Sequence, residues 1–330
     1  PTHYGNRPDR QGTLPVRFYH LCPMFDIEKT ADIAQRSSET SDNPITHTTH
    51  PTNTTDNPAM TSRTAHWQAA RLLQAKETHI RSEHTGRSYR IQTAAVGDPP
   101  PQGYPVLHIL DGDAFFPAAL SMAQSLLINP MTRSRAACII VSIGYPNGEV
   151  RDLTQRALDY TPPLPETATE AERRQYGQAD RFATFLDHEL APALAAKYPV
   201  NPKEQALFGH SFGALFGLYS LFTAPDRFKH NLLASPSVWW HNRRVLDFLP
   251  SALPADTAVR ISVGEHEGRS NRPEQIGREM VPQAKLLAGT LQHLGADAQF
   301  TLYPNANHGN TPFYALPDHI EYLRQVWQKK

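Results

Sequence analysis

The chain has 330 residues, of which 32 are Lys or Arg and 32 are Asp or Glu. This length allows one large α/β domain with a substantial core, and the balanced charge gives no reason to expect nucleic acid or an anionic membrane surface as a partner. The two cysteines, Cys22 and Cys138, do not make a disulfide framework. No apolar stretch approaches the roughly 18 residues of a membrane span, and the N-terminus has no apolar signal segment, so we expect a cytoplasmic protein.

The N-terminal part has the composition of a segment that does not fold. Residues 37–64 are dominated by Thr, Asn, Ser, Asp and His, and such a segment cannot bury enough apolar surface to offset its ordering entropy. We therefore expect residues 1–59 to be a disordered leader and residues 60–330 to form one folded domain. Because the chain begins at Pro1 and organised patterns start just after Met60, the leader is either a flexible tail or an artefact of the gene model upstream of Met60.

Short apolar runs alternate with helical patterns in the rest of the chain. The first is a predicted hairpin, with strands at residues 78–82 and 88–95 on either side of Gly86. Buried, mostly parallel strands are predicted at residues 106–110, 137–143, 206–208, 232–234, 259–263 and 300–303. Amphipathic helices are predicted around residues 182–190, 286–291 and 320–327. This alternation predicts a doubly wound α/β fold, whose mostly parallel sheet begins with an antiparallel hairpin.

A serine lies in the turn between one of these strands and the next helix. Gly209-His210-Ser211-Phe212-Gly213 follows an apolar run and precedes a helix rich in small and apolar residues, which is the context of a nucleophile elbow. Glycine on both sides allows the sharp turn, and the helix N-terminus favours negative charge beside the hydroxyl. Ser211 is therefore the candidate nucleophile, and the alternative is an ordinary strand-to-helix turn.

A serine nucleophile needs a base and an acid, which in α/β-hydrolases follow in the order serine, acid, histidine. Glu265 lies just past the strand at 259–263, and His308 follows the strand at 300–303, so both are placed at the carboxyl edge of the sheet. We expect His308 to take the serine proton and Glu265 to orient the imidazole. Glu267, on the same loop, is the rival acid.

The oxyanion of such a reaction needs two hydrogen-bond donors. The backbone N–H of Phe212, directly after the serine, is one candidate. The other is the N–H of Asp113 in the loop Leu110-Asp111-Gly112-Asp113, which follows an early strand. The alternative for this loop is a plain Asp-Gly turn that closes the strand.

Several segments together resemble the putative-esterase (esterase D-like) family of α/β-hydrolases, and within it the enterochelin esterases that open trilactone catecholate siderophores. The similar segments lie at residues 104–113, 143–146, 156–162, 209–213, 235–240, 263–265 and 308–309. The resemblance covers about residues 77–328 and implies an α/β-hydrolase fold and a serine carboxylesterase that needs no metal or organic cofactor. Some related hydrolases manage with a serine and a histidine, which leaves the acid as the open member of the set.

The resemblance also implies a small-molecule ester substrate, either the ferric or the apo form of a catecholate siderophore such as enterobactin. A ferric tris-catecholate is an aromatic trianion, so its pocket should offer arginines and aromatic rings. Arg156, Trp239 and Trp240 are the candidate substrate-binding residues, and the long connection at residues 145–179 is a candidate lid. Alternatively, Arg156 pairs with Asp159 or another carboxylate, and the two tryptophans belong to the core.

Two other functions remain open at this stage. One is a different acyl esterase of the same family, acting on formylglutathione or a feruloyl-type ester. Formylglutathione hydrolases usually carry methionine after the serine, whereas this chain has Phe212. The other is a siderophore-binding protein without hydrolysis, which would not need Ser211, His308 and an acid together.

Overall fold

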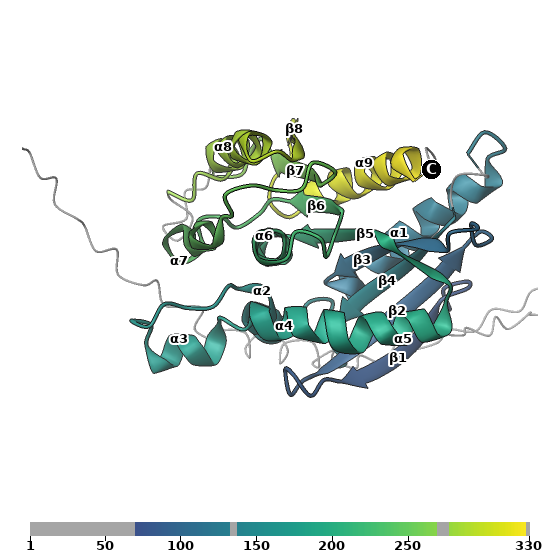
Figure 1. Cartoon of the computed structure of the whole chain (residues 1–330), viewed down its shortest axis with the longest axis horizontal. Coiled ribbons are helices and arrows are strands. Elements are labelled where there is room, and N and C mark those ends of the chain that lie inside the picture. Colours follow the sequence, from purple (N-terminus) through teal and green to yellow (C-terminus); the bar gives the residue numbers. More distant parts are fainter. Residues whose placement is uncertain (1–69, 133–136, 269–276, 328–330) are drawn as a thin grey trace, which may run out of the picture. The chain divides into compact units, whose positions relative to one another are not determined.

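The computed structural model describes residues 70–132, 137–268 and 277–327, so the expected disordered leader and the possible start at Met60 lie outside the described residues (Figure 1). The described part contains an eight-stranded sheet in the order β1-β2-β4-β3-β5-β6-β7-β8. Its strands are β1 (Lys76–Arg81), β2 (Ser88–Val96), β3 (Tyr104–Leu110), β4 (Cys138–Gly144), β5 (Val200–His210), β6 (His230–Ala234), β7 (Ala258–Gly264) and β8 (Asp297–Tyr303). β2 pairs antiparallel with β1 and with β4, and every pair from β4 to β8 is parallel. The predicted α/β sheet with an antiparallel start is confirmed.

Burial explains where the apolar runs located the strands well and where they did not. All residues of β3 and β4 are buried, so these strands appear in the sequence as continuous apolar runs. The apolar run at residues 206–208 predicts only part of β5, which extends over Val200–His210, because the polar residues of its first half lie nearer the surface. The buried second half of β5 ends at His210, directly before the candidate nucleophile.

Helices cover both faces of the sheet (Figure 1). On one face, α1 (Gly112–Ile128) and α9 (Thr311–Val326) pack against each other and against one apolar cluster of the strands. The second apolar cluster lies under the helices of the other face, which are α2 (Leu153–Tyr160), α4 (Ala179–Phe185), η3 (Leu186–Leu190), α5 (Ala191–Lys197), α6 (Phe212–Thr223) and α8 (Met280–His293). The short helices α3 (Glu170–Gln175), α7 (Trp240–Arg243) and η4 (Arg244–Phe248) lie in the connections.

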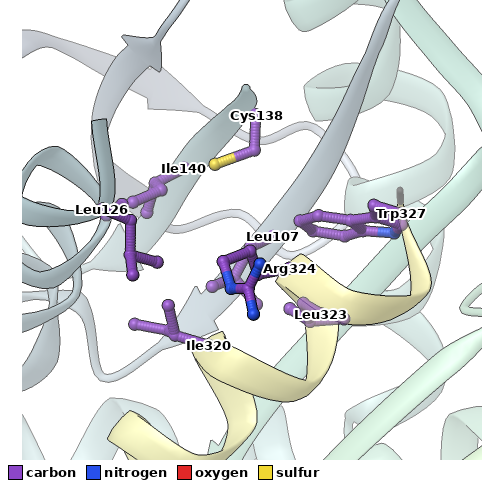
Figure 2. Close-up of a pocket in the computed structure, with 9 residues that line it drawn as sticks. Leu107, Leu126, Cys138, Ile140, Ile320, Leu323, Arg324 and Trp327 are labelled. Atoms are coloured by element: carbon purple, nitrogen blue, oxygen red, sulfur yellow. The ribbon is translucent and has the colours of Figure 1, made fainter. Parts of the chain in front are cut away.

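The face under α9 is closely packed. Figure 2 shows residues of α9, among them Ile320 and Leu323, around a small cavity beside Leu107 and Cys138. The volume of this cavity is ≈ 20 Å³. Burial raises the pKa of the Cys138 thiol to about 12, which keeps the sulfur protonated and unreactive. Across the described ranges, no helix has both the length and the apolar character needed to span a bilayer.

Candidate active site

Ser211 stands in a strained turn between β5 and α6. Its φ is 59° and its ψ is −116°, a conformation that side chains rarely adopt. A Cβ atom at Gly209 would come within 2.4 Å of the backbone of Gly213, so only glycine lets the chain fold back this tightly. The turn has the geometry expected of a nucleophile elbow, with the serine held at the first turn of α6.

The histidine predicted as the base contacts this serine. His308 Nε2 lies 3.0 Å from Ser211 Oγ, and His308 Nδ1 lies 2.7 Å from Glu267 Oε2. With its proton on Nδ1, the imidazole donates a hydrogen bond to the carboxylate and accepts one from the serine hydroxyl at Nε2. The three side chains form a continuous relay from a buried carboxylate to the hydroxyl, the arrangement that activates a serine.

The carboxylate that His308 contacts is that of Glu267, the rival acid, and not that of the expected Glu265. Both ring nitrogens of His308 are engaged, by Ser211 and by Glu267, while a carboxylate oxygen of Glu265 accepts the backbone N–H of Asn305 at 3.2 Å. Glu265 follows the end of β7 directly, but the chain turns there, because the N–H of Glu267 is bonded to the carbonyl of Gly264. The turn brings the second glutamate of the loop, not the first, under His308.

Glu267 is held in place by three further hydrogen-bond donors. Its Oε1 accepts the hydroxyl of Ser235 at 2.6 Å, the backbone N–H of Gly264 at 2.8 Å and the hydroxyl of Thr311 at 2.8 Å. Burial alone would raise the pKa of Glu267, but the hydrogen bonds from His308, Ser235 and Gly264 outweigh it and lower the pKa below its usual value. The carboxyl group is therefore kept ionised, as a partner for an imidazolium should be.

Two serines after β6 belong to the site, although the sequence pattern did not single them out for this role. Ser235 adopts a φ of 50° and bonds Glu267, and Ser237 Oγ lies 3.3 Å from Ser211 Oγ. Both are buried, and both lie in the segment 235–240, whose tryptophans alone were expected to contribute, by binding substrate. The signal that could have found them is their position directly after a parallel strand, at the same edge as Ser211.

His210, next to the serine, supports the loop of the base from beneath. It is buried, and its Nε2 lies 2.9 Å from the backbone oxygen of His308, with the two rings 4.7 Å apart. Burial, aided by the charges of His308, Arg151 and Arg156, lowers the pKa of His210 well below its usual value, so the ring is neutral. A neutral ring with its proton on Nε2 donates to that oxygen and holds the backbone of His308 in place.

The predicted oxyanion loop lies against the elbow. A Cβ atom at Gly213 would be 3.5 Å from Leu110 and 3.8 Å from a carboxylate oxygen of Asp111, so the start of α6 packs on the loop that follows β3. Asp111 has a φ of 52°, and the next residues, Gly112 and Asp113, begin α1. The first turns of α1 and α6 therefore lie close together, and the assignment of Asp113 and Phe212 as oxyanion donors stays a prediction.

Arg156, the arginine expected to bind substrate, is paired with a carboxylate of the protein itself. It is only 6% exposed, and its Nε and Nη2 each donate to Asp111 at 2.8 Å. Nη2 also lies 3.4 Å from the backbone oxygen of His210. The alternative that Arg156 pairs with a carboxylate is confirmed, and the pair ties the loop after β3 to the end of β5.

The carboxylate of Asp159, the other candidate partner of Arg156, has a different task. It is buried, pairs with Arg87, and accepts the hydroxyls of Tyr89 at 3.0 Å and Tyr145 at 2.9 Å. These bonds anchor α2 to β2 and to the end of β4. The expected lid at residues 145–179 therefore contains a helix that is fixed in the core.

The two tryptophans differ in their surroundings. Trp240 is 5% exposed and packs against Tyr176 with ring centres 5.8 Å apart, as in the alternative that it belongs to the core. Trp239 is partly exposed, lies 6.4 Å from the ring of Phe212, and has the guanidinium of Arg278 above it at 4.0 Å. Only Trp239 remains available beside the nucleophile.

Fold and site together define a class of protein. An α/β sheet with a strained serine after its fifth strand, and with a histidine and a carboxylate in later loops, is that of a serine hydrolase of the α/β-hydrolase type. In the described ranges, no three His, Cys, Asp or Glu side chains are grouped so as to hold a metal ion.

Comparison with known proteins assigns the chain to a family within this class. The family described as "Putative esterase" matches residues 82–316, more than half of the sequence, and the chain belongs to it. This confirms the predicted membership of that family.

The chain is similar to several proteins that are named as siderophore esterases or hydrolases. The chain is 37% identical over 144 residues to a siderophore triacetylfusarinine C esterase of Aspergillus fumigatus, covering 43% of this chain and 47% of that one. It is 33% identical over 171 residues to the ferri-bacillibactin esterase BesA of Bacillus subtilis, covering 50% and 59%. The chain thus spans about half of the length of these two relatives. Among solved structures, the siderophore hydrolase EstA of Aspergillus nidulans has a TM-score of 0.66 and 26% identity, covering 80% of this chain and 100% of that one.

Proposed function

We propose that the chain is a serine esterase that hydrolyses the ester bonds of a catecholate siderophore, such as the trilactone of enterobactin, in its ferric or apo form. The observation that carries the proposal is the relay Ser211–His308–Glu267, with hydrogen bonds of 3.0 Å and 2.7 Å. A binding protein without hydrolysis would not need such a relay. The substrate class rests on the siderophore esterases among the similar proteins.

The reaction follows from the positions of these groups. Ser211 Oγ attacks the ester carbonyl while its proton passes to His308 Nε2, and the negative charge that forms on the carbonyl oxygen is met by the N–H groups of Phe212 and Asp113. His308 then gives its proton to the leaving alkoxide, which leaves an acyl group on Ser211. Water, deprotonated by His308, releases the acid and restores the serine. Glu267 stabilises the imidazolium in both halves of the reaction.

The first experiment replaces the nucleophile. Ser211→Ala and the exposed control Ser251→Ala are incubated with ferric and apo enterobactin, and the products are separated by chromatography. We expect Ser251→Ala to behave as the wild type and Ser211→Ala to lose turnover by a factor that approaches about 10⁶, as in other triad enzymes.

Three outcomes would contradict the proposal in different ways. Substantial hydrolysis by Ser211→Ala would refute the nucleophile. Faster turnover of formylglutathione or a feruloyl ester than of either enterobactin form would keep the mechanism and move the substrate to another member of the family. Tight binding of ferric enterobactin without any product would favour the non-hydrolytic alternative.

A further inference from the structure

Arg151 lies at the edge of the site on the loop between β4 and α2. Its guanidinium carbon is 5.0 Å from the ring centre of Phe115, and that ring is 6.2 Å from the ring of His210. The side chain is partly buried, and its charge acts on the pKa of His210. A cation is thus held close to the residue that precedes the nucleophile.

Three other arginines near this edge are paired with carboxylates. Arg156 is bound to Asp111, Arg87 to Asp159 and Arg90 to Asp113. Arg151 has no such partner: within the part of the chain that the structure describes, no residue forms an ion pair or hydrogen bond with it, and its buried Nε has no acceptor.

The nearest acid in the sequence does not supply the missing charge. Asp152 is buried, and its carboxylate accepts the backbone N–H groups of Thr154 and Gln155 and the side-chain amides of Asn147 and Gln155. Burial lowers the pKa of Arg151, and the neighbouring charge of Arg156 lowers it further, while Asp111 acts in the opposite direction. The printed ion pair of Asp111 is with Arg156, so the charge of Arg151 is not neutralised by a contact of its own.

A partly desolvated guanidinium without an acceptor destabilises the empty site and binds an anion well when one arrives. Its fork of N–H donors fits a carboxylate or a phenolate pair better than a point charge would. Beside it, Phe313 is 52% exposed and its ring lies 5.7 Å from that of Phe115, which offers an apolar surface next to the charge. We propose that Arg151 is the residue that recognises negative charge on the acyl part of the ester substrate. This is the role that was expected of Arg156.

This inference rests on the proposed function and is tested with a matched pair of esters. The 4-nitrophenyl monoester of adipic acid and 4-nitrophenyl hexanoate have the same leaving group and chain length, and differ in one terminal carboxylate. In the wild type, we expect a preference for the adipate, measured as the ratio of the two kcat/KM values, that shrinks as salt is added because the attraction is screened. Arg151→Gln should raise KM for the adipate about tenfold or more, as expected for a lost charge-assisted contact, and change kcat/KM for the hexanoate by less than about threefold.

Further variants make the outcome decisive. Arg151→Lys keeps the charge without the fork and should give an intermediate ratio, and Arg174→Gln, which removes an exposed arginine of α3, should leave the ratio unchanged. Equal loss of both esters in Arg151→Gln, or a wild-type ratio in Arg151→Gln, would overturn the inference. If Arg151→Gln does not fold, a wild-type ratio that ignores salt overturns it instead. Hydrolysis of both esters by Ser211→Ala would refute the proposed function itself, whatever the ratio is.

Discussion

At the scale of single residues, the site depends on one buried carboxylate. Glu267 accepts hydrogen bonds from His308, Ser235, Thr311 and the backbone of Gly264. Its side chain is 1% exposed, whereas that of His308 is 45% exposed, so the imidazole has one fixed side and one open side. The bonds to Glu267 therefore decide the direction in which His308 points.

Replacement of the two glutamates of the loop should separate their roles. Glu267→Gln keeps the shape but removes the charge that stabilises the imidazolium and favours the tautomer with its proton on Nδ1. We expect kcat for 4-nitrophenyl hexanoate to fall by about 10³ to 10⁴, as when the acid of a triad is made an amide. Glu265→Gln, on the same loop, should change kcat by less than about threefold, since its carboxylate bonds the N–H of Asn305.

The opposite order of losses would restore Glu265 as the acid. Equal small losses in both variants would indicate a serine and histidine that work without an acid. Thermal unfolding of each variant serves as the control, because a variant that is partly unfolded would have a lower kcat even if its contact with His308 played no part.

The sequence predicted Ser211 and His308 but not the acid, and the reason is physical. A glycine-flanked serine between a buried strand and a helix is typical of a nucleophile elbow, and His308 is the histidine that follows the last strand. Glu265 and Glu267 lie two positions apart on one loop, so the turn at Gly264 decides which of them contacts His308. The hydrophobic pattern of the sequence does not predict that turn. The ion pair of Arg156 could not be predicted for a similar reason: the sequence shows the charge of an arginine, but not that Asp111 is its partner.

At the scale of elements, the unit made of β5 and α6 carries the site. α6 is buried from Gly213 to Phe222, and Gly209 and Gly217 let it pack closely on the strands. A Cβ atom at Gly217 would come within 2.4 Å of Leu233 on β6, while one at Gly209 would meet the backbone of α6 itself. A side chain can rotate away from such a contact but backbone cannot, so position 209 tolerates a side chain less well than position 217.

Alanine at two glycines should have opposite effects on stability. Gly209→Ala forces a contact of 2.4 Å with the backbone of Gly213, and we expect the free energy of unfolding to fall by about 1–3 kcal/mol, with loss of the elbow geometry and of activity. Gly289→Ala, inside α8 where a Cβ would meet nothing within 4 Å, should raise it by about 0.5–1 kcal/mol, because glycine is the poorer helix former. Urea unfolding followed by circular dichroism measures both. A stable and active Gly209→Ala protein would contradict the tight turn.

The elements themselves were largely predictable, since strands buried on both faces are short apolar runs. All eight described strands coincide with predicted ones, although β5 begins six residues before the predicted run because its first half is polar. Element bounds of this kind depend on pairing, here of Tyr104 with Val200, which a single sequence does not display.

At the scale of the whole molecule, the formal charges cancel, and the burial of neutral histidines becomes a main source of pH dependence. Burial lowers the pKa of His108 to about 4 and that of His319 to about 3, and it lowers the pKa of His210 well below the ordinary value of 6.5. The folded protein therefore keeps these rings neutral at a pH where the unfolded chain would protonate them.

The sign of the effect follows from proton binding. Between the ordinary pKa of 6.5 and the lowered values near 4 and 3, the unfolded state binds more protons than the folded state, so the free energy of unfolding falls as the pH falls. Each such histidine contributes a slope of up to about 1.4 kcal/mol per pH unit below its unfolded pKa. Glu267, whose pKa is lowered, adds a loss of stability only at more acidic pH, once carboxyl groups of the unfolded chain begin to protonate.

Urea unfolding from pH 8 to pH 5 should show this as a stability that is flat above about pH 7 and decreases below it. His319→Gln, which removes a buried ring packed on Phe208, should reduce the slope by about one proton, whatever it does to the absolute stability. His293→Gln, on the exposed side of α8, is the matched control for the substitution itself. A slope that is unchanged in His319→Gln would mean that the pKa of this ring is the same in the folded and the unfolded protein, which would contradict the effect of burial.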